Sequence, residues 1–163
     1  MSQKSRNSGT SHVAIFWDWQ NVKATEKQIR CLMMFAYAHG NVVLKKAYAH
    51  WKRENEELED LLCDLFELID VPSFKHKKNR ADYKLIEDCR KHVLRNPDIN
   101  TVILLSGDKD FKDLVNELKA KGKKVILIAR RDKPINPKFK ESANEFYWLS
   151  QIEQWFSNLP LVA

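Results

Sequence analysis

Aspartates follow two apolar stretches of this sequence, at the point where each stretch ends. Asp18 comes directly after VAIFW, and Asp108 and Asp110 come after TVILLS. Asp82 stands at the start of a helix-like segment, and Asn21 lies three residues beyond Asp18. Since the carboxyl ends of parallel strands meet at one edge of a sheet, these side chains converge on one pocket if the two strands are neighbours.

Carboxylates that are brought together repel one another unless a cation or shared protons compensate their charge. With no histidine or cysteine partner, clustered aspartates favour a hard, oxygen-seeking cation such as Mg²⁺ or Mn²⁺. Such an ion activates water for attack on a phosphodiester, and it neutralises charge that builds up on the phosphate oxygens. The pattern therefore predicts a divalent-metal site that acts on phosphodiester bonds.

Each of these acids also has a structural explanation. Asp108 or Asp110 can cap the helix that begins near DFKDLV, which contributes about 1 kcal/mol. Asp18 can be a turn residue, and Asp82 can be an exposed first-turn acid that the helix dipole favours. A phosphotransfer receiver domain would present a similar acidic pocket, although SGDKDF would then have no role. The coincidence of acids at two strand ends favours the metal site.

Basic residues outnumber acidic ones and are grouped. The 28 Lys and Arg against 22 Asp and Glu give a formal charge of +6, which favours a polyanionic partner. One group, KHKKNR (75–80), precedes Asp82, and another, RRDK (130–133), follows an expected strand. We expect both at the rim of the acidic pocket, where they would bind phosphates that flank the scissile bond. The candidates are Lys75, Lys77, Lys78, Arg80, Arg130 and Arg131.

Trp19 flanks Asp18 on the expected solvent side and is a candidate for stacking on a nucleobase.

Other chemistries lack their sequence signatures. The five histidines form no HExxH motif, and Cys31, Cys63 and Cys89 form no CxxC pair, so a zinc site is not indicated. Ser106 has no GxSxG context, and GxGxxG and GxxxxGK[ST] are absent. The absence of these motifs argues against serine hydrolases and against Rossmann or P-loop nucleotide binding.

Strand-like and helix-like segments alternate along the whole chain, without a repeat or a linker. The apolar strands are of the kind that is buried on both faces, which predicts a single α/β domain with a parallel sheet and helices on both faces. The expected strands cover 13–18, 41–51, 71–74, 101–106, 123–129 and 145–149. The expected helices cover 25–39, 52–69, 80–96, 110–122 and 150–159, with Thr25 as an N-cap and Gly40 as a stop.

The segments DWQN, RADYKLIED and SGDKDF together resemble the NYN domain, a PIN-like nuclease family that includes LabA-like bacterial proteins. The resemblance implies a PIN-like fold of Rossmann-like topology, with an acidic site for Mg²⁺ or Mn²⁺. It also implies ribonuclease activity, because the characterised members are mostly ribonucleases. By position, it implies that the metal-binding and catalytic acids are Asp18, Asp82, Asp108 and Asp110, with Asn21 and Ser106 as supporting residues.

From these observations we expect a metal-dependent endoribonuclease, a hydrolase that cleaves single-stranded RNA or structured loops. The alternative is a catalytically weak or inactive RNA-binding or regulatory module of the same fold, because several family members have no demonstrated activity. We expect residues 12–163 to form the domain and the polar residues 1–11 to be a disordered tail. This tail lacks the apolar core of a secretory signal, and no membrane segment is evident, so we expect a cytoplasmic protein. A homodimer is one expectation for its assembly.

Overall fold

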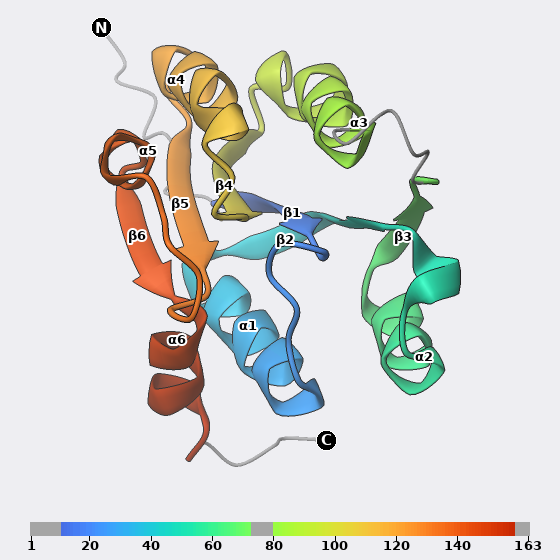
Figure 1. Ribbon diagram of the computed structural model, residues 1–163. Helices are drawn as coiled ribbons and strands as arrows, with labels where there is room; N and C mark the ends of the chain where they lie inside the picture. The colour runs from blue at the N-terminus through green and yellow to red at the C-terminus, as the bar shows by residue number, and fades with distance from the viewer. Residues whose placement is uncertain (1–10, 73–79, 159–163) are drawn as a thin grey trace, which may run out of the picture.

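A single parallel sheet organises the chain. The computed structural model describes residues 11–72 and 80–158, and its six strands pair in parallel throughout (Figure 1). The strands are β1 (His12–Asp18), β2 (Asn41–Ala49), β3 (Glu67–Asp70), β4 (Ile99–Leu105), β5 (Lys124–Ala129) and β6 (Glu145–Trp148). Of the predicted tail 1–11, only Ser11 is described, and its carbonyl oxygen accepts a hydrogen bond from the backbone N–H of Asn41.

The strand order is β3-β2-β1-β4-β5-β6. The chain moves outward from β1 to β3, returns to place β4 beside β1, and then moves outward again to β6. Strand order therefore reverses between β1 and β4, and ligands bind in the crevice beyond the carboxyl ends at such a point. Receiver domains have the order 2-1-3-4-5 instead, so the receiver alternative does not fit this sheet.

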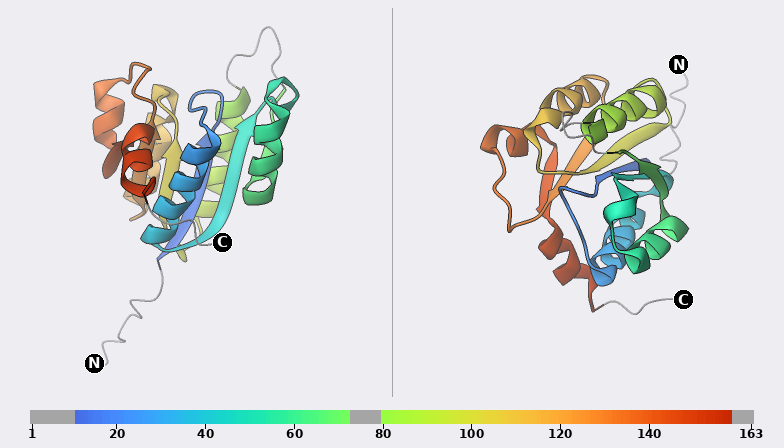
Figure 2. Two further views of the ribbon diagram at one scale, coloured as in Figure 1. Left: turned by 90° about the horizontal axis from the view of Figure 1, so that it is seen from below. Right: turned by 45° about the vertical axis from the view of Figure 1, so that its right-hand side comes forward.

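Helices cover both faces of the sheet, as the views in Figures 1 and 2 show, and the predicted α/β class is confirmed. One layer contains α1 (Glu26–His39), α2 (Glu56–Leu65) and α6 (Leu149–Phe156). The other contains α3 (Arg80–Cys89), α4 (Lys112–Ala120) and α5 (Pro137–Ser142). No helix within the described ranges combines the length and the apolar character that a bilayer crossing requires.

Alternation along β1 shows why two helical layers are needed. Ile15 and Trp17 pack into the core beneath α1 and α2, whereas Ala14 and Phe16 pack into the core beneath α3 and α4. Successive side chains of a strand point to opposite faces, so an apolar strand buries side chains in both layers only if both faces are covered. This is the pattern on which the prediction of a parallel sheet rested.

Several expected boundaries differ from the structure: the expected strand 41–51 ends at Ala49, the expected helix 52–69 begins at Glu56, and α3 ends at Cys89. The largest differences lie around β3. The expected helix 52–69 ends at Leu65, because residues 67–70 pair with β2 as β3. Lys46 of β2 donates to Glu67 Oε2 at 2.8 Å, so a contact with a distant strand overrides local helix propensity. The edge strand was expected at 71–74 and thus lies four residues earlier; residues 73 and 74 are outside the described ranges.

The short helix α5 was not expected from the sequence. Asn136 caps it by accepting hydrogen bonds from the backbone N–H groups of Lys138 and Phe139, and Pro137 occupies its first turn. Asparagine at the N-cap followed by proline is a known start signal. By contrast, the predicted cap of α1 is confirmed, since Thr25 and Gln28 form a capping box.

Candidate metal centre

The turn after β1 presents Asn21 to the end of β4. The backbone N–H groups of Asn21 and Val22 both donate to the carbonyl oxygen of Asp18, at 3.1 and 3.0 Å, which closes the turn. Asn21 Oδ1 then accepts a hydrogen bond from the backbone N–H of Gly107 at 2.7 Å. A Cβ at Gly107 would lie 3.3 Å from Asn21 Oδ1, so glycine permits this close approach of the two turns.

Ser106 joins the same two strand ends through its side chain. Its Oγ donates to Asp18 Oδ2 at 3.0 Å and accepts from the backbone N–H of Asp108 at 3.1 Å. The residue is fully buried, so water does not compete for either hydrogen bond. The two predicted supporting residues, Asn21 and Ser106, thus both bridge from the β1 end to the β4 end.

Three of the four predicted acids meet at this edge of the sheet. Asp82, Asp108 and Asp110 each offer a carboxylate oxygen, and these oxygens all lie within 4.8 Å of one another. Asp108 Oδ1 also accepts from the backbone N–H of Asp110 at 2.9 Å, so the expected capping interaction exists within the cluster. Asp82 is buried, which contradicts the alternative that it is an exposed first-turn acid. We call these three residues the aspartate trio.

Asp18 lies beside the aspartate trio and shares its electrostatic environment. Burial, with a smaller contribution from the charge of Asp108, raises the pKa of Asp18 to about 6, although the hydrogen bond from Ser106 opposes the shift. Burial also raises the pKa of Asp82, to about 8, with contributions from Asp18 and Asp108. Burial is the main cause of both shifts and the neighbouring carboxylates add to it, so the ionised acids are compensated fully neither by water nor by the protein's own cations.

This donor set suits a hard divalent cation. The trio supplies only carboxylate oxygens, the ligands that Mg²⁺ and Mn²⁺ prefer, and no histidine or cysteine belongs to it within the described residues. The raised pKa values of Asp18 and Asp82 indicate that a cation bound here would relieve charge repulsion. The residues present therefore fit the ion that the sequence suggested.

Lys133 is a cation of this site that was not among the predicted residues. Its Nζ donates to the carbonyl oxygen of Asn21 at 3.0 Å, and its charge lowers the pKa of Asp18. Arg130 Nη1 donates to the carbonyl oxygen of Lys23 at 2.7 Å, so two cations fasten the loop after β5 to the loop after β1. The RRDK run identified this loop in the sequence, but it did not indicate which of the four residues lies near the acids.

We expect Lys133→Met to raise the pKa of Asp18 above about 6, because the substitution removes a favourable charge interaction with the carboxylate. The measurement is an NMR titration of the Asp18 carboxyl carbon in wild type and variant, without divalent metal. Lys138→Met, an exposed lysine of α5, is the matched control and should leave the midpoint unchanged. An Asp18 midpoint that does not move in Lys133→Met would contradict the assignment of this cation.

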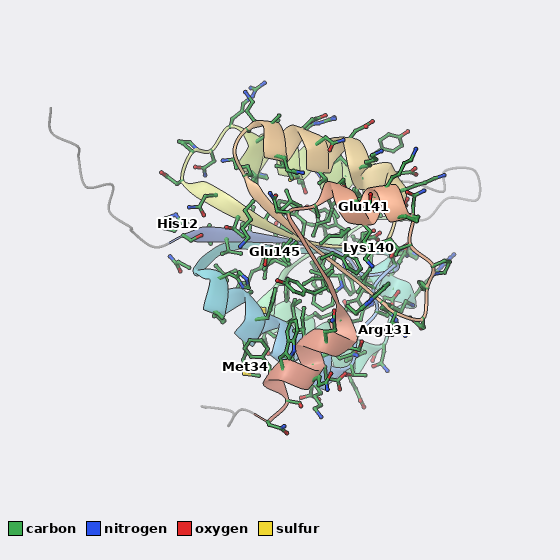
Figure 3. The ribbon with its side chains drawn as sticks, turned by 90° about the vertical axis from the view of Figure 1, so that its left-hand side faces the viewer. His12, Met34, Arg131, Lys140, Glu141 and Glu145 are labelled. Carbon is green, nitrogen blue, oxygen red and sulfur yellow. The ribbon has the colours of Figure 1, made fainter. Side chains whose placement is uncertain are left out.

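The other predicted basic residues have different surroundings. Arg130 makes two hydrogen bonds with Asp132, at 2.8 and 2.7 Å. The Arg131 guanidinium lies 5.4 Å from the centre of the Trp148 ring, and Figure 3 shows it on the loop between β5 and α5. Arg80 is the first residue of α3. The remaining candidates, Lys75, Lys77 and Lys78, lie outside the described residues.

The prediction that Trp19 faces solvent is wrong. Its side chain is 1% exposed and packs against Trp17 and Trp51, with ring centres 5.2 and 6.1 Å away. Its indole N–H donates to Glu54 Oε2 at 3.1 Å. The backbone N–H of Trp19 still donates to Tyr48 of β2, so the chain remains on the sheet for one more residue and the ring enters the core. Trp19 therefore has no free face for a nucleobase.

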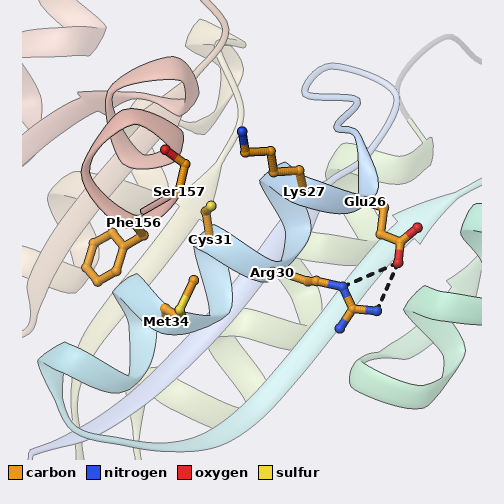
Figure 4. Close-up of a pocket in the computed structure, with 7 residues that line it drawn as sticks. All are labelled: Glu26, Lys27, Arg30, Cys31, Met34, Phe156 and Ser157. Atoms are coloured by element: carbon orange, nitrogen blue, oxygen red, sulfur yellow. Dashed lines mark hydrogen bonds and ion pairs between the residues drawn. The ribbon is translucent and has the colours of Figure 1, made fainter. Parts of the chain in front are cut away.

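A separate cavity of about 450 Å³ lies between α1 and α6 (Figure 4). Its apolar lining includes Cys31, Met34 and Phe156, and its one carboxylate, Glu26, pairs with Arg30 at 2.9 Å. The cavity belongs to the opposite helical layer from α3 and α4 and shares no residue with the aspartate trio. It does not contribute to the acidic site.

Comparisons with known proteins agree with this architecture. The family model of the NYN domain matches residues 12–150. Among solved structures, a protein of unknown function from Vibrio parahaemolyticus matches with a TM-score of 0.70 and 24% sequence identity, over 85% of this chain and 93% of that chain. This likeness shows the fold. No curated protein matches the chain significantly.

Proposed function

This chain belongs to the NYN domain family, whose fold is of the nuclease type, and on that premise we propose that it is a divalent-metal-dependent endoribonuclease. The observation that carries the proposal is the aspartate trio, Asp82, Asp108 and Asp110, at the point where strand order reverses. Its carboxylate oxygens lie close enough to share one cation, and the buried Asp18 adds negative charge beside them.

The proposed roles follow from the contacts of each side chain. Asp82, Asp108 and Asp110 would hold Mg²⁺ or Mn²⁺, and Asp18 would complete the acidic wall. When bound, the ion stabilises charge on the phosphate oxygens and makes water a stronger nucleophile. Ser106 and Asn21 fix the two strand ends relative to each other, so the acids need no rearrangement when substrate arrives.

The charge around the site supports a nucleic-acid substrate. Lys133 lies beside Asp18, and the KHKKNR segment leads into α3 and precedes Asp82 in the sequence, so cations flank the acids on the chain. We propose that these cations bind the phosphates on either side of the scissile bond, because phosphate contacts position a nucleic acid without selecting a sequence. Arg130 and Arg131 support the same loop through Asp132 and Trp148.

We expect RNA cleavage in Mn²⁺ or Mg²⁺, no cleavage in EDTA, and recovery when excess metal is restored. The physical reason is that the clustered carboxylates can neither activate water nor approach a phosphate without a cation. The measurement is a time course with end-labelled single-stranded RNA, resolved by size. Cleavage that persists in EDTA would exclude a metal mechanism, and metal-independent RNA binding without any cleavage would favour the regulatory module.

A further inference from the structure

Two adjoining cavities form one groove between α3 and α4. The first, of about 540 Å³, begins at the aspartate trio and is lined by Asp82, Asp110 and the first turn of α4. The second, of about 610 Å³, continues toward Leu94 and Arg95. Tyr83 and Ile86 line both cavities, so the two adjoin at these side chains. Figure 1 shows α3 and α4 side by side on the same face of the sheet. We call this the α3–α4 groove.

The groove has the length for a polyanion, and cations outside any ion pair in the described part of the chain line it, while its five acidic and five basic lining residues balance in formal charge. α3 continues directly into a π-helical segment, Arg90–Leu94, so the chain is helical over the 13 residues from Asp82 to Leu94, or about 20 Å, which is long enough for several nucleotides of a single strand. Among the described residues, four of the cations that line the groove form no ion pair. A fifth, Arg90, pairs with Glu117, and its Nη2 lies 2.6 Å from Glu117 Oε1. Asp113 and Glu87 are the other lining acids outside the trio. The four unengaged cations are Lys91, Arg95, Lys109 and Lys112.

Tyr83 is placed to contact a base in this groove. It follows Asp82 directly, and 72% of its surface is exposed, more than that of Tyr37 on α1 at 55%. An aromatic ring left open to solvent at the start of a charged groove is a platform on which an unpaired base can stack. Trp19, which the sequence suggested for this role, is in the core, so among the described residues Tyr83 is the accessible aromatic side chain beside the trio.

We propose that the α3–α4 groove binds single-stranded RNA, with a base stacked on Tyr83 and the following phosphates on Lys91 and Arg95. The strand would run from the aspartate trio along α3 to Arg95, beyond the end of this helix. This assignment rests on the proposed ribonuclease function, and it adds the path of the substrate and the residue that requires an unpaired base. A duplex has no unpaired base to offer Tyr83, so the groove selects single strands.

The test is binding of a 5′-fluorescein-labelled 12-nucleotide oligouridylate, followed by anisotropy in EDTA so that no metal-dependent hydrolysis occurs. We expect Tyr83→Ala to weaken binding by about 5- to 100-fold, which corresponds to one stacked base, and Tyr83→Phe to stay within about twofold of wild type. Tyr37→Ala, the same change on the opposite helical layer, is the control and should bind as wild type. Wild-type affinity in Tyr83→Ala would overturn the proposal.

The phosphate contacts have their own readout. Removing Lys91 and Arg95 together should reduce the slope of log affinity against log salt by about 1.4, because each phosphate contact of a single strand contributes about 0.7. Lys27→Ala with Arg30→Ala, on α1, removes the same charge from the other layer and should leave the slope unchanged. An equal slope for both double variants would overturn the groove assignment.

Two further arms separate the groove from the proposed function. A 12-base-pair RNA duplex should show no dependence on Tyr83, and an equal loss for duplex and single strand would overturn stacking. Cleavage in Mn²⁺ is measured separately, where Tyr83→Ala should raise KM and leave kcat near wild type. If wild type cleaves nothing while binding still depends on Tyr83, the ribonuclease proposal fails and the groove stands. If Tyr83→Ala cleaves with unchanged KM, the groove fails and the ribonuclease stands.

Discussion

Asp108→Asn is expected to lower the rate of RNA cleavage by at least about 100-fold while the protein remains folded. The carboxylate of Asp108 is one of three that meet within 4.8 Å, so the substitution removes a charge that the cation requires. A metal supplies several kcal/mol of transition-state stabilisation, and each 1.36 kcal/mol is a factor of ten in rate. The measurement is kcat/KM for labelled RNA in Mn²⁺, with the Mn²⁺ affinity of each variant from calorimetry.

Asparagine at this position separates the catalytic role from the capping role. Asp108 caps the 3-10 turn Lys109–Phe111 through Oδ1, and asparagine is an equally good N-cap, so the unfolding free energy should change little. Asp60→Asn, an exposed aspartate of α2, makes the same chemical change far from the trio and should retain full activity. Normal cleavage by Asp108→Asn, or equal losses in both variants, would contradict the assigned site.

Asp18→Asn is expected to stabilise the metal-free protein by about 3 kcal/mol at pH 8 and to abolish cleavage. Asp18 is 5% exposed, and its pKa stands at about 6 instead of 3.8. A displacement of this size corresponds to about 3 kcal/mol. Asparagine keeps an oxygen that can accept from Ser106 Oγ, so the substitution removes the cost of burying a charge and retains the hydrogen bond.

The sign of the pH dependence follows from proton uptake. The folded state holds the Asp18 proton more tightly than the unfolded state, so this group favours folding at low pH. Its contribution is lost as the pH rises from about 3.8 to about 6. Wild type and Asp18→Asn should therefore have similar stability near pH 4, and the difference should be complete above pH 6. Neutralising Asp18 also lowers the pKa of Asp82, which adds to the gain at high pH.

Urea unfolding at pH 4 and pH 8, in EDTA, measures this difference. Asp60→Asn is the matched control, because an exposed carboxylate should give no pH-dependent gain. Adding Mn²⁺ should stabilise wild type more than Asp18→Asn at pH 8, since the ion relieves the same repulsion that the amide removes. A variant that is less stable than wild type at pH 8 without metal would show that the buried charge is compensated by the protein itself.

Much of the fold could be predicted because it depends on local patterns. β1 and β4 appear in the sequence as apolar runs, and α1 appears with both its cap and its stop. One failure occurred where a distant partner decides the structure, and another where a local signal was overlooked. Residues 67–70 have helix-forming neighbours, yet they pair in parallel with β2. The backbone of β2 and the Lys46 side chain supply hydrogen bonds that an isolated helix would not have. Helix α5 was not predicted, although Asn136 at the N-cap followed by Pro137 is a local start signal for a helix.

The acidic residues were predictable for a topological reason. In a parallel sheet every strand leaves at the same edge, so acids that follow two strands share that edge whatever the order. Strand order then decides whether they touch, and β1 is the direct neighbour of β4. Asp82 reaches them from a helix, which the sequence indicated only through the resemblance to the NYN domain and its position after a basic segment.

The sequence by itself determined the class of the fold and the acids of the candidate site. The spacing of apolar residues and the position of an acid at the end of an apolar run are properties of a single chain segment. Only the tertiary structure decided which flanking side chains face solvent. It buried Trp19 against Trp51, brought Lys133 to the acids, and left Tyr83 open at the start of the α3–α4 groove. Exposure depends on what packs against a residue from elsewhere in the chain, and no local pattern records that.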